Sequence, residues 1–186
     1  MINALANHHV LPHDGKGITK AMAVAALTTS INLDSEIANI FAAVAVTANP
    51  DHSSHSFNLD QIDKHGLIEH DVSLSRNDIA FGDNHTFNKE IWKVVFETYV
   101  GIGETETSFA SVSKARYERM VKSREAHKAA GKQFGYGIKE FVLSYGESAL
   151  FLGIMGSPKE GKIPLEYLKV LFGEFKSTSS VTLYRY

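Results

Sequence analysis

The 186-residue sequence contains no cysteine. Disulfides are therefore impossible within it, and a thiol nucleophile is excluded as a catalytic group. No apolar run reaches the length of a membrane span, so no membrane partner is expected. The formal net charge of -2 gives no electrostatic reason to bind nucleic acid. The N-terminus also lacks the charged, apolar and small-residue pattern of a signal peptide.

Helical spacing is what the sequence does show, within an ordinary globular composition of 44% hydrophobic and 22% charged residues. The spacing predicts helices over residues 18–33, 35–46, 88–100, 108–130, 138–155 and 164–172. Asp34 or Ser35 is expected as the N-cap of the second of these. Strand-like alternation is scarce outside residues 181–184, and no repeat or linker divides the sequence. We predict an all-α fold of one domain with about seven helices.

Three consecutive ionisable residues, Glu69, His70 and Asp71, follow a short apolar pair. Such groups are costly to bury unless they bind something or each other. The Glu69 carboxylate, the His70 carbonyl and the Ser73 hydroxyl are oxygen ligands of the kind that magnesium or calcium takes. The alternative is that the two carboxylates cap neighbouring backbone groups or neutralise Arg76. Both interpretations stay open on the sequence alone.

Glu147 lies at the middle of the apolar helix predicted over residues 138–155. A carboxylate there lies at the edge of a cavity or is paired, because burying it alone in the ionised form is prohibitive. Desolvation would raise its pKa, which suits a general acid and base. The alternative is a surface position on a polar stripe shared with Glu140, seven residues earlier on the same helix face.

Other polar patterns are weaker. His8, His9 and His13 favour a surface cluster over a metal site, because Pro12 interrupts any helical spacing between them. The basic run over residues 114–132 carries acidic partners at helical spacing and is expected to be a solvated face. A metal-dependent hydrolase that uses the acidic cluster and the histidines is a further hypothesis.

Three segments resemble the fungal haem-thiolate peroxidases, the family of chloroperoxidase and the short unspecific peroxygenases. Residues 69–76 (Glu-His-Asp-Val-Ser-Leu-Ser-Arg) are similar to the Glu-His-Asp signature of that family. Residues 145–149 (Tyr-Gly-Glu-Ser-Ala) are similar to the segment that bears its distal acid. Residues 3–15 resemble the helix and turn that follow its Pro-Cys-Pro motif. The resemblance extends over residues 1–172, and the order and spacing of the segments agree.

The resemblance implies a peroxidase that uses hydrogen peroxide to oxidise or oxygenate small organic substrates, and also halides, with haem b as cofactor. It implies that Glu147 takes a proton from peroxide and returns it to the leaving oxygen. His70 would orient Glu147, and Asp71 would hold His70. Glu69, Ser73 and the His70 carbonyl would bind a magnesium or manganese ion beside the haem.

The same resemblance implies which apolar residues contact the cofactor. Ile68 and Leu150 would line the distal pocket, where an aliphatic Ile68 suggests room for organic substrates. Ala4 and Leu5 lie in the helix that follows the Pro-Cys-Pro motif of the family and are predicted to contact haem.

The sequence departs from the family pattern at both ends. The proximal cysteine of the family precedes the segment that matches the first residues here, so we expect a missing Pro-Cys-Pro segment ahead of Met1. Residues 173–186 read as a divergent tail after a haem-peroxidase domain over residues 1–172. A secreted protein is expected from the resemblance, and the sequence does not indicate an oligomeric state. The alternative function is a cysteine-free, non-catalytic homologue that acts as a binding or structural protein.

Overall fold

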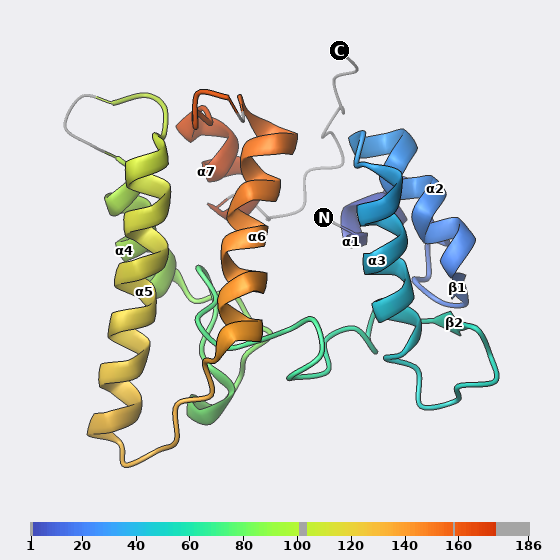
Figure 1. Cartoon of the computed structure of the whole chain (residues 1–186), viewed down its shortest axis with the longest axis horizontal. Coiled ribbons are helices and arrows are strands. Elements are labelled where there is room, and N and C mark those ends of the chain that lie inside the picture. Colours follow the sequence, from blue (N-terminus) through green and yellow to red (C-terminus); the bar gives the residue numbers. More distant parts are fainter. Residues whose placement is uncertain (1, 101–103, 158, 174–186) are drawn as a thin grey trace. The chain divides into compact units, whose positions relative to one another are not determined.

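The computed structural model describes residues 2–100, 104–157 and 159–173, and most of this chain is helical (Figure 1). The described elements are α1 (Ile2–Asn7), β1 (Ile18–Thr19), α2 (Lys20–Ile31), α3 (Ser35–Val46), β2 (Ser56–Phe57), η1 (Ile79–Phe81), α4 (Lys89–Tyr99), α5 (Phe109–Ala129), α6 (Ile138–Met155) and α7 (Leu165–Gly173). The predicted all-α class with seven helices is confirmed. None of the described helices has the length and apolarity needed to cross a bilayer.

Local capping sets several helix starts. Asp34 caps α3 by accepting from the backbone N–H groups of Glu36 and Ile37. Asn88 caps α4 in the same way, and Ser108 caps α5 in a reciprocal capping box with Ser111. These caps explain why the predicted and observed boundaries of the three helices agree to within one or two residues.

The helix predicted from residue 18 begins instead at Lys20. Ile18 and Thr19 pair in antiparallel register with Phe57 and Ser56, which makes a short two-stranded sheet. Thr19 then accepts a hydrogen bond from the Met22 N–H and caps α2. The strand predicted over residues 181–184 lies outside the described residues, as does the divergent tail apart from Gly173.

The described chain packs as two compact units. The first unit comprises Met1–Asp71, Asp78–His85 and Gly135–Leu143, and the second comprises Val72–Asn77, Thr86–Phe134 and Ser144–Tyr186. Each unit has its own cluster of buried hydrophobic residues. The division falls directly after Glu-His-Asp, between Asp71 and Val72, and within α6, so the predicted site residues fall in both units.

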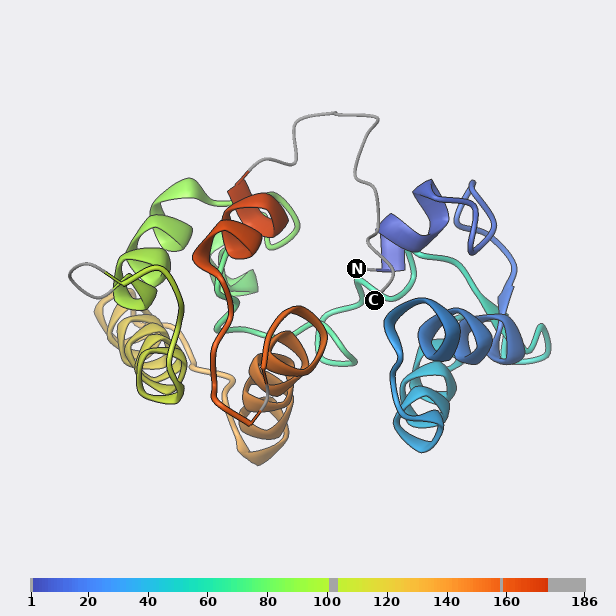
Figure 2. The same cartoon turned by 90° about the horizontal axis from the view of Figure 1, so that it is seen from above.

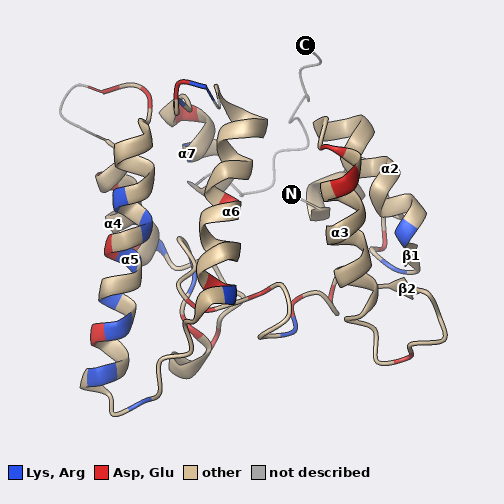
Figure 3. Ribbon diagram, viewed as in Figure 1, with Lys and Arg blue, Asp and Glu red and all other residues tan. Residues whose placement is uncertain are grey.

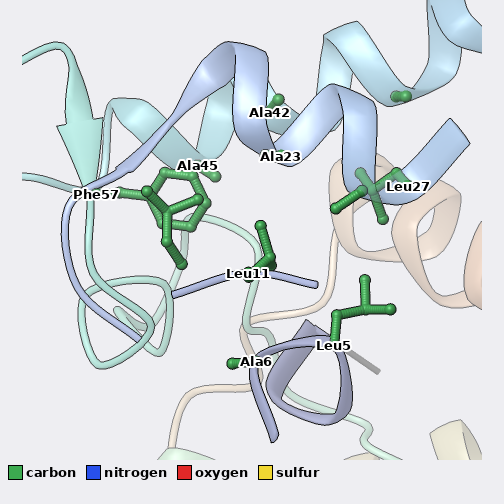
Figure 4. Close-up of a cluster of buried hydrophobic side chains, with 11 residues drawn as sticks. Leu5, Ala6, Leu11, Ala23, Leu27, Ala42, Ala45 and Phe57 are labelled. Carbon is green, nitrogen blue, oxygen red and sulfur yellow. The ribbon is translucent and has the colours of Figure 1, made fainter. Parts of the chain in front are cut away.

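The core of the first unit is built largely from alanine (Figure 4). Helices α2 and α3 lie side by side in both Figures 1 and 2. Their contact buries Ala23, Ala26, Ala38, Ala42 and Ala45. Small side chains allow the two helix axes to approach closely. Larger side chains complete the cluster, namely Leu5, Leu11, Ile18, Leu27 and Phe57.

The core of the second unit is aromatic. Trp92 of α4 stacks on Phe172 of α7, with ring centroids 4.2 Å apart, and meets Tyr99 edge-on at 6.3 Å. Aliphatic residues fill the remainder of this core, namely Leu74, Val95, Val112, Leu152, Ile163, Leu165 and Leu168. An aromatic ring buries more area than an aliphatic side chain, so we expect these aromatic contacts to contribute strongly to the stability of this core.

Tyr99 is expected to make the second unit less stable at alkaline pH. Burial raises the pKa of its hydroxyl to about 12, against the lowering effect of the Arg116 charge. The unfolded chain therefore loses this proton at lower pH than the folded protein. The stabilisation is fully present below about pH 10, and we expect the free energy of unfolding to fall by about 2 to 3 kcal/mol between pH 10 and 12.

Urea unfolding at several pH values measures this effect. Tyr99→Phe should remove the corresponding part of the decline, because phenylalanine carries no titrating proton. Tyr117→Phe is the matched control, since Tyr117 is 57% exposed. The same alkaline decline in Tyr99→Phe as in the wild type would contradict the prediction.

Candidate functional site

The acidic signature begins in the first unit with a paired carboxylate. Glu69 Oε2 lies 2.7 Å from His65 Nδ1, and the Glu69 side chain is only 6% exposed. The Gly66 N–H donates to the Glu69 carbonyl at 2.9 Å, which closes the turn between the two residues. The Lys139 ammonium donates to the Gly66 carbonyl and so fixes this turn from α6. Glu69 is therefore held at one oxygen by a histidine.

His70 is buried and bonded to its neighbour. Its Nδ1 contacts the backbone carbonyl oxygen of Asp71. A carbonyl oxygen only accepts, so Nδ1 carries the hydrogen, and Nε2 of the neutral ring is the proton-accepting nitrogen. The Asp71 carboxylate accepts from the Ile79 N–H at 2.9 Å, at the start of η1. The described contact that orients His70 is thus made by the main chain of Asp71.

The signature continues into the second unit through Val72, whose backbone is unusual. Its φ of 69° is in the left-handed region, and its side chain is completely buried. A β-branched residue pays a steric cost in this conformation, so surrounding contacts must hold it there. One such contact comes from Arg116 of α5, whose Nη1 donates to the Val72 carbonyl at 3.4 Å.

A second arginine of α5 holds the following residues. Arg119 Nε donates to the Ser73 carbonyl at 2.8 Å, and its Nη2 donates to the Arg76 carbonyl at 3.3 Å. The Ser73 hydroxyl in turn accepts from the Ser75 N–H at 3.3 Å. The loop Val72–Asn77 is therefore fastened to α5 through its main-chain oxygens.

Glu147 of α6 is paired with Arg116. Its Oε2 lies 2.8 Å from Arg116 Nη2, and its side chain is 43% exposed while that of Arg116 is 1% exposed. Arg116 Nε donates to the Ser148 hydroxyl at 2.8 Å, and this hydroxyl donates to the Ser144 carbonyl. Of the two arrangements expected for Glu147, the structure shows the paired one. The burial on which a raised pKa would depend is not met.

The prediction that residues 114–132 form a solvated face is wrong for two arginines. Figure 3 shows basic residues along the length of α5, and the lysines among them are exposed. Arg116 and Arg119 are buried instead, at 2% and 9% exposure, on the same face as the buried residues Ser123 and His127. Spacings of three and four residues join these positions to the apolar Val112, which is the sequence signal that identifies this face.

The predicted site residues divide between the two units. The first unit holds Ala4, Leu5, Ile68, Glu69, His70 and Asp71, and the second holds Ser73, Glu147 and Leu150. Within the first unit, Leu5 is 3% exposed in the alanine-rich core, and Ile68 packs partly buried against it. Within the second unit, Glu147 meets Arg116. The joint action of Glu147 with His70 stays a prediction, as do the haem contacts.

The predicted metal ligands also belong to both units, so their convergence stays a prediction. Their chemistry, one carboxylate, one carbonyl and one hydroxyl, suits a hard cation. Among the described residues, no group of three or more histidine, aspartate or glutamate side chains is placed to hold a metal ion. The hydrolase hypothesis therefore gains no support from the described chain.

Comparison with known proteins gives consistent matches. A family model described as "Peroxidase, family 2" matches residues 1–180. The chain is 24% identical to an aromatic peroxygenase of Cyclocybe aegerita over 191 residues, which cover 92% of the chain and 50% of that protein. It is 27% identical to a chloroperoxidase of Leptoxyphium fumago over 137 residues, which cover 67% of the chain and 36% of that protein.

A third relative is an aromatic peroxygenase of Coprinellus radians, 23% identical over 200 residues that cover 94% of the chain and 73% of that protein. The chain thus spans about half the length of the first of these relatives and about a third of the second.

Proposed function

Because the chain belongs to the family described as peroxidase, family 2, we propose that it uses hydrogen peroxide to oxidise or oxygenate small organic substrates, halides included. The observation that carries this proposal is the ion pair of Glu147, a half-exposed carboxylate held by the buried guanidinium of Arg116. A carboxylate that is both accessible and ionised is equipped to accept a proton from a bound reactant.

In the proposed reaction Glu147 would take the proton from one oxygen of hydrogen peroxide and return it to the other oxygen, which would leave as water. Haem, when bound, would supply the two electrons that breaking the O–O bond requires. His70 would orient Glu147 by accepting a hydrogen bond at Nε2 while Glu147 carries the proton, and the Asp71 carbonyl would fix the ring. Proton transfer by a positioned side chain contributes about 100- to 10,000-fold to a rate. The aliphatic side chain of Ile68 would leave room for organic substrates that are larger than peroxide.

The acidic cluster is proposed to hold a magnesium or manganese ion through Glu69, the His70 carbonyl and Ser73. One point of chemistry limits this assignment. Glu69 Oε2 is already paired with His65, so a cation would have to share or displace the imidazole.

The residues present do not fit haem-thiolate ligation. The family uses haem, and a proximal thiolate is what favours O–O cleavage in haem-thiolate enzymes. None of the 186 residues is a cysteine, so none of them can supply this ligand. The chain would contribute the proposed acid and its supports, and haem-thiolate chemistry would need a cysteine from outside these 186 residues.

Titration of the 186-residue chain with haemin tests this statement. We expect weak binding, little peroxide turnover, and no red-shifted Soret band in the reduced carbon monoxide complex, because no thiolate is available. The matched control is the same chain preceded by a Pro-Cys-Pro segment, which should acquire that band and turnover. Robust peroxide turnover by the cysteine-free chain would contradict the prediction.

A second candidate function is a cysteine-free, non-catalytic homologue that serves as a binding or structural protein. The lack of cysteine favours it, and the sequence of the full-length transcript decides between the two. A Pro-Cys-Pro codon run in frame ahead of Met1 supports the enzyme, and unrelated sequence there supports the homologue.

Secretion is proposed from family membership alone. Residues 84–86 (Asn-His-Thr) form a glycosylation sequon, but it adds no support for secretion, because the Asn84 side-chain nitrogen is buried.

A further inference from the structure

Arg116 lies where three segments of the second unit meet. It projects from α5, and its guanidinium reaches the Val72 carbonyl, the Ser148 hydroxyl and the Glu147 carboxylate. Each of its three nitrogens makes one of these hydrogen bonds, so each contact is directed by the planar shape of the group. None of the sequence motifs that indicate the family includes this arginine.

Burial makes these contacts energetically significant. The Arg116 side chain is 1% exposed, and a buried cation requires a nearby anion and satisfied hydrogen bonds to offset its desolvation. Glu147 is the carboxylate that supplies this charge at 2.8 Å. The Ser148 hydroxyl and the Val72 carbonyl satisfy the remaining nitrogens. The guanidinium is therefore confined to one position, and the Glu147 carboxylate is held where that position requires.

We propose that Arg116 is the positioning residue of Glu147. Arg116 holds the Glu147 side chain as an oriented carboxylate beside the loop that begins at Val72. This inference rests on the proposed function for its catalytic meaning. It deepens that function by assigning the residue that orients the proposed acid. A fixed cation beside a carboxylate favours its charged form, which is the form that can accept a proton.

The connection to Val72 gives the arrangement a second consequence. The left-handed backbone of Val72 needs a contact that holds it, and Arg116 supplies one from the same guanidinium that binds Glu147. One side chain thereby links the signature loop to the acid-bearing helix. A change at Arg116 is expected to loosen both the loop and the helix. A change at Ser148 removes only the hydroxyl that accepts from Arg116 Nε.

Carbodiimide labelling of carboxyl groups tests the proposal without cofactor or turnover. The reagent activates protonated carboxyl groups, which then couple to an added amine, and mass spectrometry reads the yield at each site. The exposed Glu125 of α5 is the internal reference in the same sample. The variants are Arg116→Met, which keeps most of the side-chain length without charge, and Arg116→Lys, which keeps the charge without the fork.

We expect the labelling ratio of Glu147 to Glu125 to rise about tenfold in Arg116→Met and by an intermediate factor in Arg116→Lys, because an adjacent cation disfavours the protonated carboxyl. Circular dichroism establishes that each variant is folded. Ser148→Ala is the smaller change if neither arginine variant folds, and it should raise the ratio about twofold by freeing the guanidinium. An unchanged ratio in the folded variants would overturn the proposal.

The outcomes separate this inference from the proposed function. Increased labelling in Arg116→Met together with absent peroxide turnover in the cysteine-supplied protein would retain Arg116 as the partner of Glu147 and reject the peroxidase. Unchanged labelling together with measurable turnover would reject the role of Arg116 and retain the peroxidase. Equal increases in Arg116→Met and Arg116→Lys would show that the fork, rather than the charge, holds the carboxylate.

Discussion

Replacing Glu147 by glutamine is expected to lower kcat/KM for hydrogen peroxide by about 100- to 10,000-fold in protein that carries the proximal cysteine. Glutamine has nearly the same shape as glutamate, and its side-chain oxygen still accepts a hydrogen bond from Arg116. It cannot take up a proton from peroxide. The change therefore removes the proposed acid–base chemistry while it leaves most contacts of the helix in place.

The experiment compares steady-state kinetics of the wild type and Glu147→Gln at equal haem content. Glu140→Gln is the matched control, because Glu140 lies on the same helix and bonds locally to the Gly137 N–H. It should keep its rate. A Glu147→Gln protein with wild-type kcat/KM would remove Glu147 from the mechanism, and the acid–base role would then have to be carried by another residue.

Helices α3, α4 and α5 could be predicted from the sequence because their determinants are local. Asp34, Asn88 and Ser108 each bond to backbone groups two or three residues ahead, and a hydrophobic spacing follows each cap. No distant part of the chain is needed to place these boundaries. The predicted and observed ranges of α6 are also identical.

The features that sequence reasoning missed depend on distant partners. Ile18 pairs with Phe57, and nothing in either short segment specifies the other. Arg116 and Arg119 are buried because they bond to main-chain carbonyls of the loop Val72–Asn77. Every residue carries such a carbonyl, so residue types do not predict these partners. The division into two cores is likewise invisible in a chain without a linker.

The candidate site shows the same contrast. Glu147 and the Glu-His-Asp segment could be found because their residue types are unusual in apolar surroundings and because they resemble a family pattern. Their supports could not. His65 beside Glu69, the Asp71 carbonyl beside His70 and Arg116 beside Glu147 are all set by folding. The sequence therefore indicated candidate reacting groups, which stay a prediction, and the structure shows which residues contact them.

The largest effect on stability is expected at Trp92. Trp92→Ala should lower the free energy of unfolding by about 3 to 5 kcal/mol, the usual cost of deleting a buried tryptophan side chain. Trp92 is 7% exposed and contacts Phe172, Tyr99 and Phe96, so the deletion removes the centre of the aromatic core. Urea unfolding followed by circular dichroism measures this change, since Trp92 is the single tryptophan and its fluorescence is lost with it.

Trp92→Phe and Val94→Ala are the controls for the stability loss expected in Trp92→Ala. Phenylalanine keeps an aromatic ring against Phe172 and should restore most of the stability, whereas Val94 is 36% exposed on the same helix and should cost less than about 1 kcal/mol. If Trp92→Ala cost no more than Val94→Ala, the stacked rings would not be the core of the second unit. The support that this core gives to α5, and through Arg116 to Glu147, would then need another source.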